Sequence, residues 1–272
     1  MDKCEDGVVT TADFVAVIDG STSKSPYRID PQMANGRLCM LTVSNYIRHM
    51  QADMTAREFC KNITSAIRDV YVSYGVNMRR LAENPAERMT ASAVVFSKCR
   101  RQVWMIGDCQ CIVDGVAHDN PKPYEQLLAS RRAEHIRRAL ANGASADDFR
   151  HDDKGRAAIL PQLVAACMGQ NKAFAVIDGF DIPYEYVKII DVNDTEGDIV
   201  LASDGYPFLL PTLRESEDAL ARQLADDPLC IDSFKATKGL MYGNHSFDDR
   251  CYIRFRQTMP GTAIANAHQT DG

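Results

Sequence analysis

Phe14-Val-Ala-Val-Ile-Asp-Gly20 is a short apolar run that ends in an Asp-Gly dipeptide. A run of this length, closed by a turn signal, indicates a buried β-strand that stops at a turn. The polar residues that follow, Ser21-Thr-Ser-Lys24, lead after Pro31 into a helical pattern. We therefore expect Asp19 at the rim of a sheet, where a strand gives way to a loop.

Periodic patterns outward from this strand predict two packed helices and then a series of short strands. The first helix carries Met33, Leu38, Leu41 and Ile47, and the second carries a clear apolar stripe from Phe59 to Tyr74 behind a Thr55 cap. The remaining expected elements are strands over 91–96, 102–106 and 111–116, a basic helix over 124–142, a surface loop through 156, two strands around Asp178-Gly179, a strand over 198–202, a helix over 215–224 and a strand over 251–255.

Helices inserted early between strands, with most strands in hairpins, favour an antiparallel α+β fold over a doubly wound parallel one. We expect one domain over residues 1–256 and a loose C-terminal tail over 257–272, where periodicity is absent. The sequence contains neither a G-x-G-x-x-G motif nor a P-loop motif. Nucleotide binding of those two kinds is therefore not supported.

Composition places the chain among ordinary globular proteins. Its 272 residues are 45% hydrophobic and 25% charged, and the formal net charge of −6 argues against nucleic acid as a partner. The apolar runs are too short to cross a membrane, and the N-terminus lacks the apolar stretch of a signal peptide. Nine irregularly spaced cysteines favour reduced thiols in a cytoplasmic protein. The basic cluster of Arg131, Arg132, Arg137 and Arg138 is typical of a solvated helix face.

Three aspartates stand at junctions between a strand and a loop: Asp19 in Val-Ile-Asp-Gly, Asp204 in Ala-Ser-Asp-Gly and Asp248 in Phe-Asp-Asp. Carboxylates held at the rim of a sheet repel one another unless a cation neutralises them. Oxygen-only ligand sets suit Mg²⁺ or Mn²⁺. The three positions therefore predict a divalent-cation site.

The Asp-Gly dipeptide alone decides nothing, because Ala-Val-Ile-Asp-Gly occurs identically at residues 16–20 and 175–179. Asp178 leads towards an apolar run, as a hairpin turn would, whereas Asp19 leads into Ser-Thr-Ser-Lys and a helix. We interpret Asp178, and Asp114 in another Asp-Gly pair, as structural residues.

Taken in order, six segments resemble the motifs of protein phosphatase 2C enzymes over roughly residues 4–256. They are Cys4-Glu-Asp6, Phe14-Val-Ala-Val-Ile-Asp-Gly20, Thr90-Ala-Ser-Ala-Val-Val95, Ile106-Gly-Asp-Cys109, Ile199-Val-Leu-Ala-Ser-Asp-Gly205 and Phe247-Asp-Asp249. Each motif is weak alone, but their order and spacing together are fairly specific. The chain looks like a divergent, bacterial-type member.

The resemblance implies a four-layer α-β-β-α fold, an antiparallel β-sandwich flanked by helices, with two Mn²⁺ or Mg²⁺ ions at one end. Asp19 would bridge the ions, the Gly20 carbonyl would bind one, and Asp204 and Asp248 would complete the pair. Glu5 and Asp6 would organise the metal-bound waters, and Asp108 would hold a third, weaker ion. The implied reaction is direct in-line attack of a metal-activated bridging water on a phospho-Ser or phospho-Thr protein, or on a small phosphomonoester, without a phosphoenzyme.

Departures from the family pattern favour an alternative. The arginine that usually precedes the acidic pair and grips the substrate phosphate is replaced by Met1, and whether Met1 is the natural start stays open. Lys3, Lys24 and Arg28 are the candidates to replace it. Ser21-Thr-Ser also stands where many members have His-Gly-Gly. The alternative is a catalytically weak or inactive regulatory protein that keeps the phosphatase fold. The Asp19-Gly-Ser-Thr turn is also similar to that of actin-like and sugar kinases, but its spacing differs.

Overall fold

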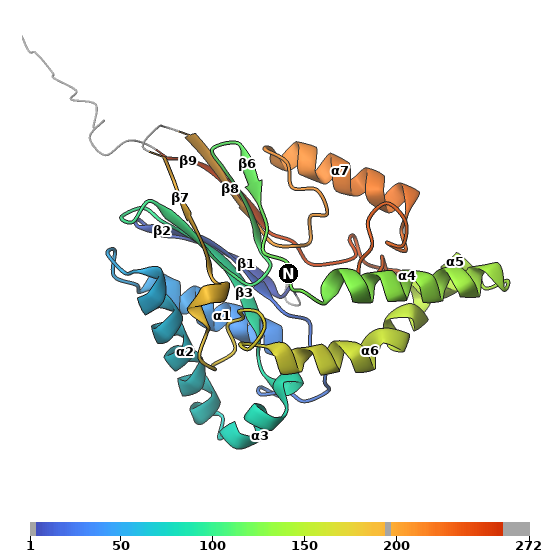
Figure 1. Ribbon diagram of the computed structural model, residues 1–272, viewed down its shortest axis with the longest axis horizontal. Helices are drawn as coiled ribbons and strands as arrows, with labels where there is room; N and C mark the ends of the chain where they lie inside the picture. The colour runs from blue at the N-terminus through green and yellow to red at the C-terminus, as the bar shows by residue number, and fades with distance from the viewer. Residues whose placement is uncertain (1–3, 194–196, 258–272) are drawn as a thin grey trace, which may run out of the picture.

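Two antiparallel sheets pack face to face in the computed structural model, which describes residues 4–193 and 197–257 (Figure 1). The five-stranded sheet has the order β1-β2-β3-β4-β7 and the four-stranded sheet has the order β6-β5-β8-β9. The strands of the first sheet are β1 (Asp6–Thr10), β2 (Phe14–Gly20), β3 (Ala91–Ser97), β4 (Gln102–Ile106) and β7 (Lys188–Asp191). Those of the second are β5 (Gln110–Val113), β6 (Val116–His118), β8 (Gly197–Ala202) and β9 (Tyr252–Gln257).

Strand β2 is apolar from Phe14 to Ile18 because both of its faces are covered there. Val17 packs into the core between the two sheets, together with residues of β3, β4, β5 and β8. Ala16 and Ile18 point the other way and pack with Trp104 into the core beneath the helices. Since successive side chains of a strand face opposite sides, a strand buried on both sides has no polar alternation.

Helices α1 (Asn35–Arg48) and α2 (Ala56–Ser73) cover the outer face of the five-stranded sheet (Figure 1). The expected Thr55 cap is confirmed: the side chains of Thr55 and Glu58 form a reciprocal capping box. Phe59, Ile63 and Ile67 form the buried stripe of α2. The short helix α3 (Met78–Glu83) follows.

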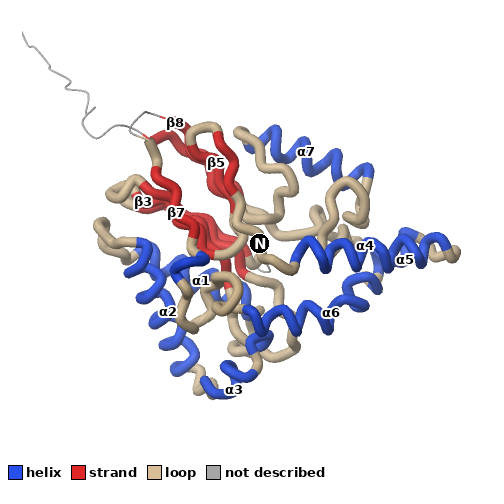
Figure 2. The backbone as a smooth tube through the Cα atoms, viewed as in Figure 1, coloured by secondary structure: helices blue, strands red, loops and turns tan. Residues whose placement is uncertain are grey.

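Helix α7 (Leu213–Asp226) flanks the four-stranded sheet and contacts β9. The fold is thus the expected α+β class, an antiparallel sandwich with helices outside. A helical arm extends from one end of the sandwich and consists of α4 (Glu125–Ala141), α5 (Ala146–His151) and α6 (Lys154–Ala166) (Figure 2). Among the described helices, none is both long and apolar enough to span a membrane.

The arm corrects one sequence prediction, because the segment expected to be a surface loop through Arg156 is mostly helical. Ser145 caps α5 and Asp153 caps α6, each by accepting a hydrogen bond from a backbone N–H of the first turn. Polar residues such as these are common in loops, but here their side chains cap the first turns of helices.

The basic cluster on α4 is also not simply a solvated face. Arg132 is completely buried, and its guanidinium donates to Asp153 at 3.0 Å and to the Leu229 carbonyl at 2.8 Å. This ion pair joins α4 to the start of α6, and the carbonyl contact joins both to the loop before β9.

The strands expected around Asp178-Gly179 do not form a hairpin. Ile177 makes only an isolated bridge to Ala91, residues 184–186 form a 3-10 turn, and β7 pairs with β4 instead. Residues 111–116 are likewise split into β5 and β6 by a turn at Asp114, whose φ is 51°. At the C-terminus, Gln257 is the last residue of β9, and the rest of the expected tail lies outside the described residues.

Asp178 has a structural role, as expected. Its carboxylate is fully buried and accepts hydrogen bonds from Arg88 at 2.8 Å, from the Asn171 amide at 2.8 Å and from the Phe180 N–H at 2.9 Å. Every one of these donors lies outside the acidic end of the sandwich described below.

Substitution of Asp178 by Ala is expected to lower the free energy of unfolding by about 3–5 kcal/mol, because it leaves the Arg88 guanidinium buried and uncompensated. Urea unfolding followed by circular dichroism measures the loss. Asp181→Ala is the control: this carboxylate is 90% exposed in its ion pair with Arg68, so its removal should leave the stability nearly unchanged. Equal losses in both variants would contradict the assignment.

Candidate active site

The antiparallel register of the first sheet brings three of the aspartates to one end. Asp6, at the start of β1, is paired with Asp19, near the end of β2. Asp19 is paired in turn with Ser92 at the start of β3. Strand β4 runs back to the same end and finishes at Ile106, two residues before Asp108. Asp6, Asp19 and Asp108 therefore share one edge.

The second sheet delivers two more acidic residues to that edge. Strand β8 ends at Ala202, two residues before Asp204, and Ala202 is paired with Tyr252 at the start of β9. Asp248 lies four residues before Tyr252. Because the two sheets pack face to face, the loops at this end meet in one pocket that is lined by Asp19, Asp108, Asp204 and Asp248.

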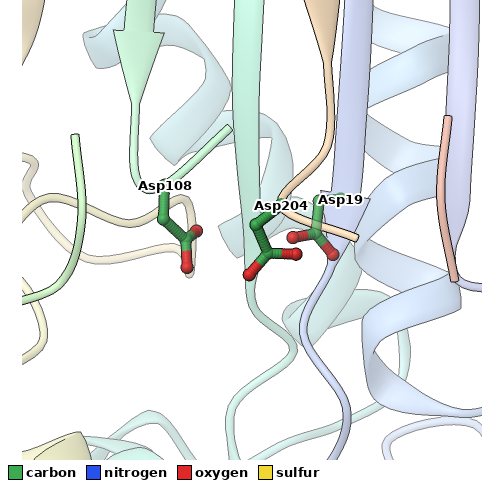
Figure 3. A group of neighbouring side chains, drawn as sticks. All are labelled: Asp19, Asp108 and Asp204. Atoms are coloured by element: carbon green, nitrogen blue, oxygen red, sulfur yellow. The ribbon is translucent and has the colours of Figure 1, made fainter. Parts of the chain in front are cut away.

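Asp19, Asp108 and Asp204 form the closest group. One carboxylate oxygen of each lies within 4.8 Å of those of the other two, and Figure 3 shows the carboxylates gathered beneath the strand ends. A set of carboxylate oxygens at this spacing could hold a hard divalent cation such as Mg²⁺ or Mn²⁺. Asp108, expected in a secondary position, is thus a member of the closest group, while Asp248 lines the same pocket beside it.

Glycine is required after Asp19 because the backbone is approached very closely there. A Cβ on Gly20 would lie 2.4 Å from the Gly36 carbonyl oxygen and 2.6 Å from that of Glu5. The close approach packs the start of α1 and the residue before β1 against the turn. This places Glu5 directly beside the Asp19-Gly20 segment.

The carboxylates of the pocket destabilise one another's charge. Burial raises the pKa of Asp19 well above its ordinary value, and the neighbouring charges of Asp6 and Asp108 raise it further. Burial and the charges of Asp19 and Asp108 raise the pKa of Asp204 in the same way. A bound cation would reverse this effect, since it favours the ionised form of every carboxylate around it.

Glu5 and Asp6 lie beside this group, since Asp6 is paired with Asp19 and the Glu5 carbonyl accepts a hydrogen bond from the Gly20 N–H at 3.0 Å. Glu5 Oε1 and Asp6 Oδ2 are buried and lack a hydrogen-bond partner among the described residues. Burial raises the pKa of Asp6 to about 7. Buried carboxylate oxygens without a partner are costly in a finished fold, so these atoms fit a site completed by cations or ordered water. The donor set therefore fits the divalent ions expected from the sequence.

Two lysines that the sequence analysis did not single out neutralise part of this charge. Lys122 makes an ion pair with Asp108 and lies 3.7 Å from Glu125. Ser92 Oγ donates to the other oxygen of Asp108 at 2.5 Å. Burial opposes ionisation of Asp108, but Lys122 and Ser92 outweigh it and lower the pKa of Asp108 to about 2.

Lys238 plays the corresponding part for Asp248, with which it makes an ion pair. The Asp249 N–H donates to the same Asp248 oxygen at 2.9 Å, and Asp249 accepts from the Glu5 N–H at 2.8 Å. These bonds tie the loop before β9 to the start of β1. Asp248 is thus held by an ammonium group on one side and by its own loop on the other.

The three candidates for a phosphate-binding cation differ in position. Lys24 lines the pocket. Arg28 is exposed and donates to the Ser25 carbonyl at 3.5 Å, outside the pocket lining. Lys3 lies outside the described residues. Arg156, from the first turn of α6, also lines the pocket and was not a candidate, because its segment was expected to be a surface loop.

The comparisons with known proteins differ between sequence and structure. No protein-family model and no curated protein matches the sequence. Solved structures of bacterial phosphatases do match. The catalytic domain of the serine threonine protein phosphatase PstP, in complex with two manganese ions, is 11% identical over 96% of this chain and 94% of that chain, with a TM-score of 0.45.

Two further structures have similar figures. A bacterial serine phosphatase is 12% identical over 95% of this chain and 94% of its own, with a TM-score of 0.46. The serine/threonine phosphatase Stp1 from Staphylococcus aureus is 13% identical over 93% and 89%, with a TM-score of 0.42.

Mn²⁺ is expected to stabilise the protein strongly, and Asp204→Asn to remove most of that effect. At 100 times the dissociation constant, a single bound ion adds about 2.7 kcal/mol to the free energy of unfolding. Without metal, Asp204→Asn should be at least as stable as the unchanged chain, because it removes one of the repelling carboxylates.

Thermal unfolding with EDTA and with Mn²⁺ separates these two effects. Asp181→Asn, on an exposed residue, should keep the full Mn²⁺ shift. An Asp204→Asn protein that is stabilised by Mn²⁺ as much as the unchanged chain would argue against Asp204 as a ligand.

Proposed function

We propose that this chain is a metal-dependent phosphomonoester hydrolase, a phospho-Ser or phospho-Thr protein phosphatase of the protein phosphatase 2C type. The observation that carries the proposal is the group of Asp19, Asp108 and Asp204, held together at the meeting ends of two sheets in a pocket that also contains cationic side chains. Acidic groups supply ligands for cations, and cationic groups attract a phosphate. Both are needed for phosphoryl transfer to water.

The assignment of roles follows the positions of the side chains. Asp19, the Gly20 carbonyl, Asp204 and Asp248 would hold two Mn²⁺ or Mg²⁺ ions, with Asp108 available for a weaker third. When bound, such ions lower the pKa of water and stabilise charge on the phosphoryl oxygens. Glu5 Oε1 and Asp6 Oδ2, which are buried and lack a hydrogen-bond partner in the described chain, would accept hydrogen bonds from waters and so fix their orientation.

The surroundings of the pocket favour a phosphoprotein over a small ester. The acidic pocket itself is small, about 70 Å³. It shares Thr22, Arg156, Lys238 and Asp248 with a neighbouring open cavity of about 1130 Å³. A phosphoryl group could enter the small pocket while the chain that carries it occupies the large one, whose volume is somewhat above the range of about 300–1,000 Å³ that is typical of small-molecule pockets.

The compartment proposed is the cytoplasm. All nine cysteines fall within the described residues and none is paired. Most of them are buried, and burial raises the pKa of Cys39, Cys60 and Cys109. Buried thiols of this kind are typical of proteins kept in a reducing environment.

A second function, that of a binding or regulatory protein with little turnover, is favoured by the two lysines. Lys122 and Lys238 form ion pairs with Asp108 and Asp248. A site that is partly satisfied by its own ammonium groups could bind a phosphorylated partner and hydrolyse it slowly.

Turnover distinguishes the two functions. We expect hydrolysis of para-nitrophenyl phosphate in the presence of Mn²⁺, complete loss of activity with EDTA, and a loss of at least about a hundredfold in Asp204→Asn, as for removal of one charge-stabilising group. Steady-state rates with Mn²⁺ and then Mg²⁺ test this, with Asp181→Asn as the matched control. Binding of Mn²⁺ without any hydrolysis would support the regulatory alternative instead.

A further inference from the structure

Four cationic side chains line the acidic pocket, and each comes from a different part of the chain. Lys24 follows β2, Lys122 precedes α4, Arg156 belongs to the first turn of α6 and Lys238 lies in the loop before β9. Positively charged side chains repel metal ions, so a pocket that bound only metal ions would not need four of them. Their presence indicates that something negative binds there as well.

Two of these cations have a carboxylate partner and two do not. Lys122 and Lys238 are paired with Asp108 and Asp248. Lys24 Nζ instead donates to Ser21 Oγ at 3.0 Å and to the Thr22 carbonyl at 3.1 Å. In the described part of the chain, neither Lys24 nor Arg156 has a carboxylate oxygen within salt-bridge distance.

Arg156 is held in place by one edge of its guanidinium. Nη1 donates to the Thr237 carbonyl at 3.1 Å and to Thr237 Oγ1 at 3.4 Å. No hydrogen bond to a described residue occupies Nε or Nη2. An arginine anchored in this way keeps donors in a planar fork, and such a fork matches two oxygens of a phosphate.

The surroundings of Lys24 and Arg156 disfavour the charged form of each side chain. Burial lowers the pKa of Lys24, and the neighbouring charges of Lys122, Arg156 and Lys238 lower it further. Burial also lowers the pKa of Arg156. Lys24 and Arg156 are partly buried, and partly buried cations without a carboxylate within salt-bridge distance are costly, so an anion that binds between them relieves a penalty already present in the fold.

The formal charge of the pocket determines which anion it attracts. Five carboxylates and four cations line it, a formal charge of −1 with all groups ionised. One bound divalent ion changes that charge to +1, and two change it to +3. A metal-loaded pocket therefore attracts a phosphate dianion, which the bare pocket does not.

We propose that Lys24 and Arg156 together bind the phosphoryl group of the substrate and the phosphate product, in place of an arginine before β1, so that the arm of α4, α5 and α6 takes part in substrate recognition. This inference rests on the proposed function, since it names the anion-binding half of the same site. The ligand class is a phosphate monoester dianion or inorganic phosphate.

Calorimetric titration of inorganic phosphate into the Mg²⁺-loaded full chain tests the proposal. Arg156→Ala and Lys24→Ala should each weaken phosphate binding at least about tenfold, equivalent to about 1.4 kcal/mol. Arg156→Lys should recover part of the loss, because it restores the charge but not the fork. In all variants the Mg²⁺ affinity should change by less than about threefold, since neither side chain is a metal donor.

The chain offers matched controls for both substitutions. Lys154→Ala removes an exposed cation two residues from Arg156 in the same helical turn, and Arg28→Ala removes an exposed cation four residues from Lys24. Both should bind phosphate within about twofold of the unchanged chain, as expected for solvent-exposed charges. If Arg156→Ala proves unstable, Lys24→Ala still tests the proposal. Lys24 lies on a loop, so its substitution should leave the thermal unfolding of the chain unchanged.

The outcomes separate this inference from the proposed function. If the chain hydrolyses phosphate esters but Lys24→Ala and Arg156→Ala keep both phosphate affinity and KM within twofold, the inference is overturned and the phosphatase stands. If the chain shows no hydrolysis but the two variants lose phosphate binding, the inference holds and the regulatory alternative is favoured. Equal losses of phosphate affinity in the variants and in their controls would show an effect of general surface charge and would overturn the inference.

Discussion

The active-site end of this structure depends on one constraint, the mutual repulsion among closely spaced carboxylates. Asp6, Asp19, Asp108, Asp204 and Asp248 are brought together by strand register and sheet packing, and burial makes the ionised forms of Asp6, Asp19 and Asp204 unfavourable. A hydrophobic core does not need such a cluster, and the free energy of folding would improve without it. The cluster therefore has to be stabilised by cations, either bound ions or the protein's own side chains.

Both kinds of stabilisation are visible in the way the loops are arranged. Lys122 and Lys238 supply internal counter-charge on two sides of the pocket, at Asp108 and Asp248. Asp19 and Asp204 have no ammonium partner in the described chain, and their carboxylates lie next to each other in Figure 3. The protein's own ion pairs thus leave Asp19 and Asp204 for bound ions, and the remaining cations, Lys24 and Arg156, line the same pocket.

The sequence allowed prediction of what depends on short-range pattern. The strand that begins at Phe14, the Thr55 cap and the positions of Asp19 and Asp204 at strand ends all follow from local hydrophobicity and turn chemistry. Lys122 and Arg156 could not be found this way, because each reaches the pocket only through the fold of the arm. Arg132 was misinterpreted for a related reason: its partner Asp153 is 21 residues away, and nothing in the local pattern distinguishes a buried arginine from a solvated one.

The repeated pentapeptide Ala-Val-Ile-Asp-Gly shows most clearly where local sequence stops being informative. At residues 16–20 it lies in an interior strand of a sheet with four other carboxylates around its aspartate, so Asp19 is short of positive charge. At residues 175–179 it makes a single bridge, and Arg88, Asn171 and a backbone N–H satisfy the carboxylate of Asp178 completely. An identical side chain on an identical local sequence is thus a candidate ligand in one place and a structural anchor in the other. The difference lies in the groups that the fold brings to each carboxylate, and a satisfied carboxylate has no capacity left for a cation.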